Sequence, residues 1–278
     1  VNSVVNALHH RTLTSMADIA NALDKSDDTQ YFRDQAAKVK KAFQEKLMDP
    51  ISGIVIDGEG SPHSALHANI FALACDLVPD ENLERVKAYV QSRGMACSVY
   101  ASQILLEALY AAGADAYALS LMTSTGERSW AHMIYDVGTT IALEAWDNRF
   151  KPNQDWNHAW GAAPAGVIPF NLMGIQPLEP GFGKVRIAPQ PGALRWAQIT
   201  TPTIRGPITI SFNNDPGKSF HLEVDVPGNV SAQLAVPRLG SDDPSITVDG
   251  HRILGTIEDN FIFVDGIGSG HHVVERSV

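Results

Sequence analysis

The chain has 278 residues, of which 44% are hydrophobic and 19% are charged, a composition typical of a folded globular protein with one large domain or two smaller ones. Acidic residues outnumber basic residues by 31 to 21, and the formal net charge of −10 argues against nucleic acid or an anionic membrane as a partner. Two cysteines are too few for a disulfide framework, and no apolar run approaches the ~20 residues of a membrane span.

The first part of the chain is predicted to be a helical hairpin. Apolar residues recur at helical spacing in two successive segments, 5–23 and 32–47, separated by a short polar turn. The second helix is expected to end before Asp49-Pro50, because the residue before a proline disfavours the helical conformation. Two such helices joined by a short turn form an αα-hairpin.

Further helices follow a glycine-rich loop at 52–62. They are predicted at 66–77, 80–93, 98–111 and 116–121. Ser98 is expected to cap its helix, and Gly94 is expected to end the preceding one with a left-handed conformation. The pattern indicates seven or eight helices in hairpin pairs before about Leu172.

A pair of histidines raises the possibility of a metal site in this helical part. His63 and His67 are four residues apart and share a helix face, but no third ligand lies at a matching spacing. Polar lining or capping is the favoured interpretation, and no metal and no other cofactor is predicted.

The stretch 138–161 is rich in side chains that can bind a ligand or take part in catalysis. It brings together carboxylates, tryptophans, an arginine and a histidine. Carbohydrate sites use this mixture, because indole faces stack on sugar rings while carboxylates and imidazoles hold hydroxyls or move protons. A buried amphipathic segment, with tryptophans in the core and charges in water, is equally compatible with the composition.

Local signals assign a structure to this stretch. Gly138 and two threonines before an apolar run suit a helix start, which would place Glu144 and Trp146 early in an inward-facing helix. An irregular loop is expected over 148–156, and Asn157 is a good N-cap for the segment that follows. Pro164 and Pro169 are expected to kink or break that segment.

The pattern changes from helix to strand near Met173. Four residues that alternate strictly with polar ones illustrate the strand period: Phe220, Leu222, Val224 and Val226. Gly and Pro pairs interrupt the strands every eight to twelve residues, as in antiparallel β-sandwiches. We therefore predict a helical domain over 1–173 and a β-sandwich domain over 174–278, with His271 and His272 as exposed loop residues.

Several motifs occur together in one order along the chain. They are Arg93-Gly-Met-Ala-Cys-Ser-Val-Tyr100, Thr123-Ser-Thr with Ser129-Trp130 and Met133-Ile134, Gly138-Thr-Thr with Glu144-Ala-Trp146-Asp147, Asn157-His158-Ala-Trp-Gly161, and Gly174-Ile with Pro177-Leu-Glu-Pro-Gly181-Phe. In this order they resemble the C-terminal half of family-78 glycoside hydrolases, the α-L-rhamnosidases, over about Val1 to Phe212.

The resemblance implies an (α/α)6 barrel closed from six helical hairpins, followed by an accessory β-sandwich. This chain supplies helices for about four hairpins, so the barrel is expected to be partial or to be completed by sequence outside the chain. The expected ligand is a rhamnose-containing glycoside or polysaccharide, and the expected partner is the missing N-terminal part of the same polypeptide.

The resemblance also assigns roles within 130–158. Glu144 matches the general base of an inverting glycosidase, which needs a second carboxylate as general acid. Substrate-binding positions are carried over to Trp130, Trp146 and His158. Asp147 and Arg149 are further substrate-binding candidates, and a pair that orients the loop is an equally good interpretation of them. The family's acidic motif with the general acid is absent from this sequence, so we expect the chain alone to be inactive.

Two alternatives to a rhamnosidase fragment remain open. One is a non-catalytic glycan-binding or structural module with the same pocket walls. The other is a different hydrolase or lyase built on helical hairpins, although such a protein is not expected to share the motif order. The aglycone, the linkage and the cellular compartment stay undetermined by the sequence.

Overall fold

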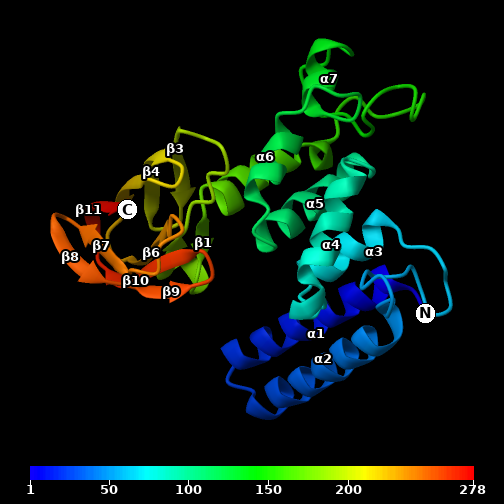
Figure 1. Cartoon of the computed structure of the whole chain (residues 1–278), viewed down its shortest axis with the longest axis horizontal. Helices are drawn as coiled ribbons and strands as arrows, with labels where there is room; N and C mark the ends of the chain where they lie inside the picture. Colours follow the sequence, from blue (N-terminus) through cyan, green and yellow to red (C-terminus); the bar gives the residue numbers. More distant parts are fainter. The chain divides into compact units, whose positions relative to one another are not determined.

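The computed structural model describes residues 1–278, which divide into two compact units, Val1–Ala163 and Pro164–Val278. The first unit is helical, and the second is built mainly of β-strands (Figure 1). This order confirms the predicted fold class of helical hairpins followed by a β-sandwich. The predicted domain boundary at 173 stays a prediction. None of the helices has both the length and the apolar character that crossing a membrane requires.

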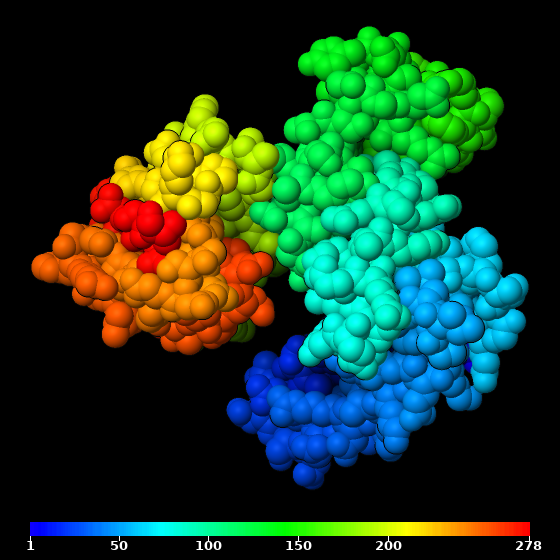
Figure 2. Space-filling view, in the orientation of Figure 1, coloured from blue at the N-terminus to red at the C-terminus, as the bar shows by residue number.

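The first unit contains seven α-helices and one turn of 3₁₀ helix. These are α1 (Ser3–Ala22), α2 (Ser26–Leu47), α3 (Leu66–Ala74), α4 (Asp80–Arg93), α5 (Val99–Ala111), α6 (Asp115–Met122), α7 (Trp130–Tyr135) and η1 (Ala159–Gly161). The predicted helices up to Met122 are confirmed. The α1–α2 hairpin lies at one end of this unit and the α7 segment lies at the other (Figures 1 and 2).

Local signals account for several helix ends. The Ser98 hydroxyl accepts a hydrogen bond from the Ala101 amide at the start of α5, as predicted, and Gly94 follows α4 with a positive φ of 56°. Ser129 caps α7 in the same way as Ser98, accepting from the His132 amide. These side chains supply partners for amide groups that have none inside the helix.

The buried side of α1 carries mostly small residues. The α1 residues that are buried are Ser3, Ala7, His10, Ala17 and Ala20. The apolar residues whose spacing predicted this helix are instead exposed: Val5, Leu8, Met16, Ile19 and Leu23. The helix is therefore confirmed, but its apolar side forms an exposed stripe, which we call the α1 stripe.

The segment after α7 differs from the prediction. No helix begins at Gly138; residues 138–158 form an irregular loop, and Glu144 and Trp146 lie within it rather than in an inward-facing helix. The Thr139 hydroxyl bonds with the backbone of Ile141, which is a turn contact that competes with helix formation. Asn157 does not cap a helix either, because His158 holds the N-cap position of η1 and makes no side-chain cap bond.

The second unit opens with short helical turns and continues as two sheets. A short helix α8 (Ala163–Val167), which starts at the last residue of the first unit, runs into a π-helical turn η2 (Ile168–Leu172), which fits the break predicted at Pro164 and Pro169. A 3₁₀ turn, η3 (Pro180–Phe182), lies between β1 and β2. The strands are β1 (Ile175–Pro177), β2 (Lys184–Ile187), β3 (Trp196–Thr203), β4 (Gly206–Asp215), β5 (Ser219–Val226), β6 (Ser231–Pro237), β7 (Ser245–Val248), β8 (His251–Leu254), β9 (Thr256–Glu258), β10 (Phe261–Ile267) and β11 (Gly270–Ser277).

The two sheets have the orders β1-β2-β6-β10-β9 and β3-β4-β5-β11-β7-β8. All neighbours are antiparallel except β2 and β6, which are parallel. In β5 the predicted alternation is confirmed, since Phe220, Leu222, Val224 and Val226 are all buried. His271 and His272 are not loop residues as predicted; they lie in β11, where each pairs with an aspartate.

The glycine at 174 suits a close approach of two backbone segments in the second unit. Gly174 has a φ of +70°, and a Cβ atom added there would lie 2.1 Å from the carbonyl oxygen of Ala188. Gly217, in the turn between β4 and β5, has a similar φ of +75°, but an added Cβ would meet nothing within 4 Å. The two glycines therefore share their backbone requirement and differ in steric contact.

This pair predicts the effect of adding one methyl group. We expect Gly217→Ala to lower the free energy of unfolding by roughly 1–2 kcal/mol, the cost of a left-handed alanine. Gly174→Ala adds a backbone clash, so we expect a loss of roughly 2–5 kcal/mol. Urea unfolding followed by circular dichroism measures both, and equal losses would contradict the steric account of Gly174.

Candidate functional site

The loop 138–158 is folded back on itself by backbone hydrogen bonds. The Glu144 amide donates to the carbonyl oxygen of Asp155 at 3.1 Å, and the His158 amide donates to the carbonyl oxygen of Ala142 at 2.9 Å. Between these two points the buried side chain of Gln154 accepts from the Ala145 amide at 2.8 Å. The loop is therefore irregular but well held, and it presents Glu144 from a fixed backbone.

The Glu144 carboxylate accepts hydrogen bonds on both oxygens. Oε1 accepts from the Tyr100 hydroxyl at 3.1 Å and from the Lys151 ammonium, and Oε2 accepts from the Asp155 amide at 2.9 Å. The Lys151 contact, the Asp155 amide and the Tyr100 hydroxyl lower the pKa of Glu144 to about 2. Glu144 is thus an ionised carboxylate near neutral pH, and its side chain is only 14% exposed.

An aromatic cluster lies against this carboxylate. The ring of Tyr100, which reaches Glu144 from α5, makes edge contacts with His158 at 5.1 Å and with Trp160 at 5.6 Å between ring centroids. Trp160 is 72% exposed, so its indole has a free surface. A carboxylate beside an exposed indole and an imidazole is the arrangement that sugar recognition uses. We call Glu144, Tyr100, His158 and Trp160 the carboxylate–aromatic site.

The two tryptophans predicted as substrate contacts lie in or against the core, with Trp146 buried and Trp130 partly buried. Trp146 is 3% exposed, and its indole N–H donates to the carbonyl oxygen of Cys97 at 2.8 Å. It packs edge-on against Trp130, with ring centroids 5.1 Å apart, and Trp130 donates to the carbonyl oxygen of Gly161 at 2.6 Å. These two indoles pack against each other and help to hold the loop. A direct sugar contact for either stays a prediction.

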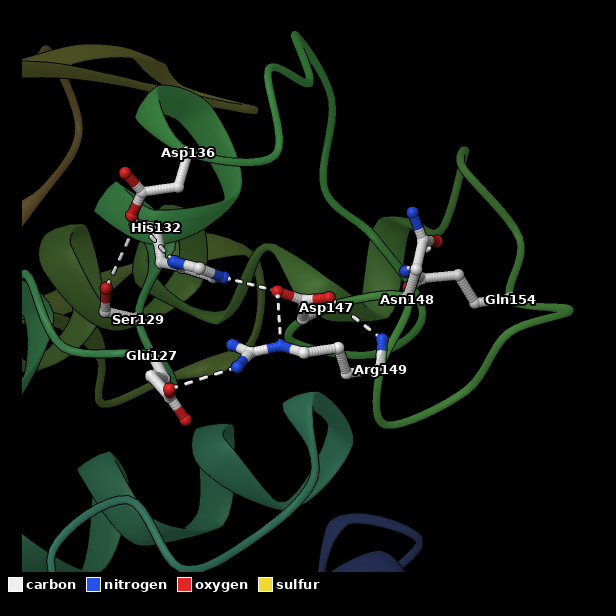
Figure 3. A network of polar contacts seen from close by, with 8 residues as sticks. All are labelled: Glu127, Ser129, His132, Asp136, Asp147, Asn148, Arg149 and Gln154. Atoms are coloured by element: carbon white, nitrogen blue, oxygen red, sulfur yellow. Dashed lines mark hydrogen bonds and ion pairs between the residues drawn. The ribbon is translucent and has the colours of Figure 1, made fainter.

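Asp147 and Arg149 form part of a polar network beside the loop. Asp147 Oδ1 accepts from the Arg149 amide at 2.8 Å, and Oδ2 accepts from Arg149 Nε at 3.1 Å and from His132 Nε2 at 2.7 Å. Arg149 reaches on to Glu127 at 3.1 Å (Figure 3). The Arg149 amide and His132 lower the pKa of Asp147 to about 2. This network holds the loop, and the direct substrate contact predicted for Asp147 and Arg149 stays a prediction.

The second unit has two surface pockets that differ from the carboxylate–aromatic site. One, of about 650 Å³, is lined mainly by apolar residues between Pro177 and Ile204, and the other, of about 400 Å³, is lined by polar residues around Arg276. Each has a single carboxylate in its lining, Glu179 in the first and Glu275 in the second. Neither pocket combines a carboxylate with an exposed tryptophan, which leaves Glu144 as the better candidate.

Comparison with known sequence families agrees with the helical hairpins and the β domain that follows them. Residues 1–172 match the bacterial alpha-L-rhamnosidase six-hairpin glycosidase domain, and residues 174–247 match the bacterial alpha-L-rhamnosidase C-terminal domain. The fold is thus that of a six-hairpin glycosidase domain followed by a C-terminal β domain. The chain belongs to the bacterial α-L-rhamnosidase family, as the motif order predicts.

Individual relatives are consistent with this assignment. The α-L-rhamnosidase of Streptomyces avermitilis is 26% identical over 276 residues, which cover 92% of this chain and 25% of that protein. The α-L-rhamnosidase of Formosa agariphila is 28% identical, with 88% of this chain and 27% of that protein covered. The chain therefore spans about a quarter of the length of the curated relatives it matches.

Solved structures show the same fold. The structure of the α-L-rhamnosidase from Dictyoglumus thermophilum superimposes with a TM-score of 0.80 at 20% identity, covering 97% of this chain and 31% of that one. The Streptomyces avermitilis α-L-rhamnosidase complexed with L-rhamnose gives a TM-score of 0.78 at 25% identity, with 98% of this chain and 26% of that one covered.

Sequence reasoning missed four residues that the structure brings to the site. Trp160 lies within the quoted motif 157–161 and is exposed beside Tyr100. Tyr100 and Lys151 hold the Glu144 carboxylate, and His132 holds Asp147. Tyr100 lies within a quoted family motif, so that motif was the available signal. Lys151 and His132 had no signal, because their partners lie across an irregular loop whose path the sequence pattern does not specify.

The ion pair at Glu144 predicts a change in its titration. Because the Lys151 ammonium is the largest cause of the lowered pKa, Lys151→Met should raise the pKa of Glu144 from about 2 toward its ordinary value near 4.5. Carboxyl carbon NMR of the 278-residue chain measures this shift. Lys184→Met removes an equivalent ion pair with Asp265 in the second unit and should leave Glu144 unchanged. An unchanged pKa in Lys151→Met would contradict the contact.

Proposed function

We propose that this chain is the C-terminal part of an α-L-rhamnosidase, and that the complete protein hydrolyses terminal α-L-rhamnosides with inversion at the anomeric carbon. Family membership and the names of the relatives support the substrate class. The observation that carries the proposal is the carboxylate–aromatic site, in which Glu144 is ionised and fixed and bonds to Tyr100, whose ring packs edge-on against the exposed indole of Trp160.

Glu144 is proposed to act as the general base. In an inverting glycosidase this carboxylate takes a proton from a water molecule, whose oxygen attacks the anomeric carbon on the face opposite the departing oxygen. A carboxylate with a pKa of about 2 is a weak base, because proton transfer to it has little driving force. Release of Oε1 by Lys151 would both raise this basicity and free one oxygen for the water.

Contacts with the sugar are proposed for the exposed members of the site. Trp160 offers an open indole face for the apolar side of the ring, and His158, whose side chain is 23% exposed, offers ring nitrogens for a hydroxyl. Trp130 and Trp146 are proposed to shape the pocket wall from the interior side. Asp147 and Arg149 are proposed to orient the loop through their mutual ion pair.

The general acid is proposed to come from sequence outside this chain. The two carboxyl groups of an inverting enzyme lie ~6.5–9.5 Å apart, so the second one must reach that distance from Glu144. The exposed α1 stripe supports an additional helical partner, because apolar residues at three- and four-residue spacing normally pack against another helix. We propose that upstream hairpins of the same polypeptide cover this stripe.

A second candidate function is favoured by the Glu144–Lys151 ion pair. A carboxylate that stays paired with a lysine can hold sugar hydroxyls but accepts a proton poorly. The second candidate is therefore a glycan-binding module that keeps the pocket walls without hydrolysing its ligand. Separate measurements of the hydrolysis rate and of the affinity for the sugar distinguish the two functions.

The proposed base predicts a specific loss of rate. In the complete polypeptide, Glu144→Gln should lower kcat for an aryl α-L-rhamnoside by ~10²–10⁴-fold, because the amide cannot take a proton from water. Affinity for L-rhamnose, measured by calorimetry, should change little. Glu258→Gln, at an exposed carboxylate of β9, serves as the control and should retain full activity. Full activity in Glu144→Gln would contradict the assigned base.

The proposed origin of the general acid predicts that the 278-residue chain is inactive alone. It should release no rhamnose from an aryl α-L-rhamnoside above the buffer rate, since it lacks both the acid and the positioning that a closed pocket provides. The complete polypeptide is the positive control in the same assay. Robust turnover by the purified chain would show that the acid is already present and would refute its upstream origin.

A further inference from the structure

His132 has an unusual pair of partners. Its Nδ1 lies 2.7 Å from Asp136 Oδ2, and its Nε2 lies 2.7 Å from Asp147 Oδ2. Figure 3 shows the imidazole between the two carboxylates, one on each side. A carboxylate oxygen only accepts, so each ring nitrogen must carry a hydrogen. A neutral imidazole has one N–H and satisfies only one of these contacts, so the geometry requires the imidazolium form.

The position of His132 links two parts of the helical unit. The residue lies in the first turn of α7, where its amide donates to Ser129 Oγ at 3.0 Å. Asp136 follows at the end of the same helix and is exposed, whereas Asp147 comes from the loop and is mostly buried. His132 is thus fixed on α7 and holds the loop residue that lies three positions after Glu144.

We propose that His132, as an imidazolium, is a positioning residue that ties the loop carrying Glu144 to α7, and that its deprotonation sets an alkaline limit on hydrolysis without any contact to substrate. This inference rests on the proposed function of Glu144. His132 acts through Asp147 and Trp146: the Asp147 carboxylate is fixed from outside the loop by His132, and the adjacent Trp146 indole is locked in the core.

The surrounding charges determine the direction of the effect. Three carboxylates, Asp136, Asp147 and Glu127, face two cations, His132 and Arg149. Loss of the His132 proton leaves a lone pair facing a carboxylate and adds one unit of net negative charge to the cluster. Arg149 still contacts Asp147, but Arg149 belongs to the same loop and provides no tie to α7.

The sign of the pH dependence follows from the same contacts. The hydrogen bond to Asp147, followed by the one to Asp136, raises the pKa of His132 above its ordinary value of 6.5. A group whose pKa is raised in the folded state stabilises that state fully below the unfolded pKa, and the contribution is lost as the pH rises through the folded pKa. The tie is therefore complete below pH 6.5 and weakens as the pH rises through the raised pKa of His132.

The test removes Asp136, the partner of His132 that does not belong to the loop. Asp136→Asn in the complete polypeptide deletes one of the two carboxylates, which lowers the pKa of His132, so the alkaline limb of kcat should move down by about one pH unit. His132→Gln keeps a hydrogen-bond donor but removes the group that titrates. It should lower kcat by about 10-fold or more with little change in KM, and it should abolish this limb.

A matched control exists in the second unit. His221 on β5 also has both ring nitrogens on carboxylates, at 3.1 Å from Glu223 and 3.2 Å from Glu275. Glu223→Gln should lower the pKa of His221 and leave the pH profile of hydrolysis unchanged. An alkaline limb that stays in place in Asp136→Asn, or one that moves equally in Glu223→Gln, overturns the role of His132.

A second readout does not depend on catalysis. In the 278-residue chain, NMR of the His132 ring should show titration above pH 6.5, and the amide of Ala145 should exchange faster once that titration is complete. Titration at or below 6.5, or unchanged exchange across it, overturns the proposal. If the complete polypeptide releases no rhamnose while both NMR results hold, the proposed function fails and the tie between α7 and the loop stands.

Discussion

The site depends on a reciprocal contact between Glu144 and Asp155. The Glu144 amide donates to the Asp155 carbonyl oxygen, and the Asp155 amide donates back to the Glu144 carboxylate. The backbone and the side chain of one residue are thereby fixed by one partner across the loop. Because the loop has no regular secondary structure, this contact replaces the hydrogen-bond ladder that a helix or strand would provide.

Once the carboxylate is fixed, its electrostatic environment follows. Donors on three sides, from Tyr100, Lys151 and the Asp155 amide, favour the charged form and keep Glu144 ionised. The same donors oppose proton transfer from water to Glu144. The arrangement therefore keeps the base unprotonated but makes it weaker. Of the three, Lys151 is the one on a flexible and partly exposed side chain, which makes it the donor that substrate or water can displace.

Burial distinguishes the tryptophans of this stretch, which composition alone does not. Trp146, next to the chemistry in sequence, is a core residue whose indole N–H is already bonded. Trp160, further along, has the free surface. Both residues belong to one stretch of indoles and acids, but burial decides which can stack on a ligand.

Helices and strands were predictable where a repeating pattern sets local structure. The period of 32–47 and the alternation of 220–226 are confirmed by α2 and β5, because burial on one face imposes such periods. The same pattern in α1 predicted the helix but not its exposure, since periodicity does not identify the partner that covers a face. The irregular loop predicted over 148–156 is confirmed, but its extension back to Gly138 was not predicted, because that part depends on pairings such as Ala142 with His158, which no local pattern encodes.

The measurement that tests the central claim most directly is a crystal structure of the complete polypeptide with L-rhamnose. We expect a sugar ring against the exposed face of Trp160. We also expect a water molecule that bridges a Glu144 oxygen and the anomeric carbon, with Lys151 displaced from that oxygen. A sugar bound elsewhere, or one bound here while Lys151 still covers Glu144 and no water reaches it, would contradict the assignment of Glu144 as the base.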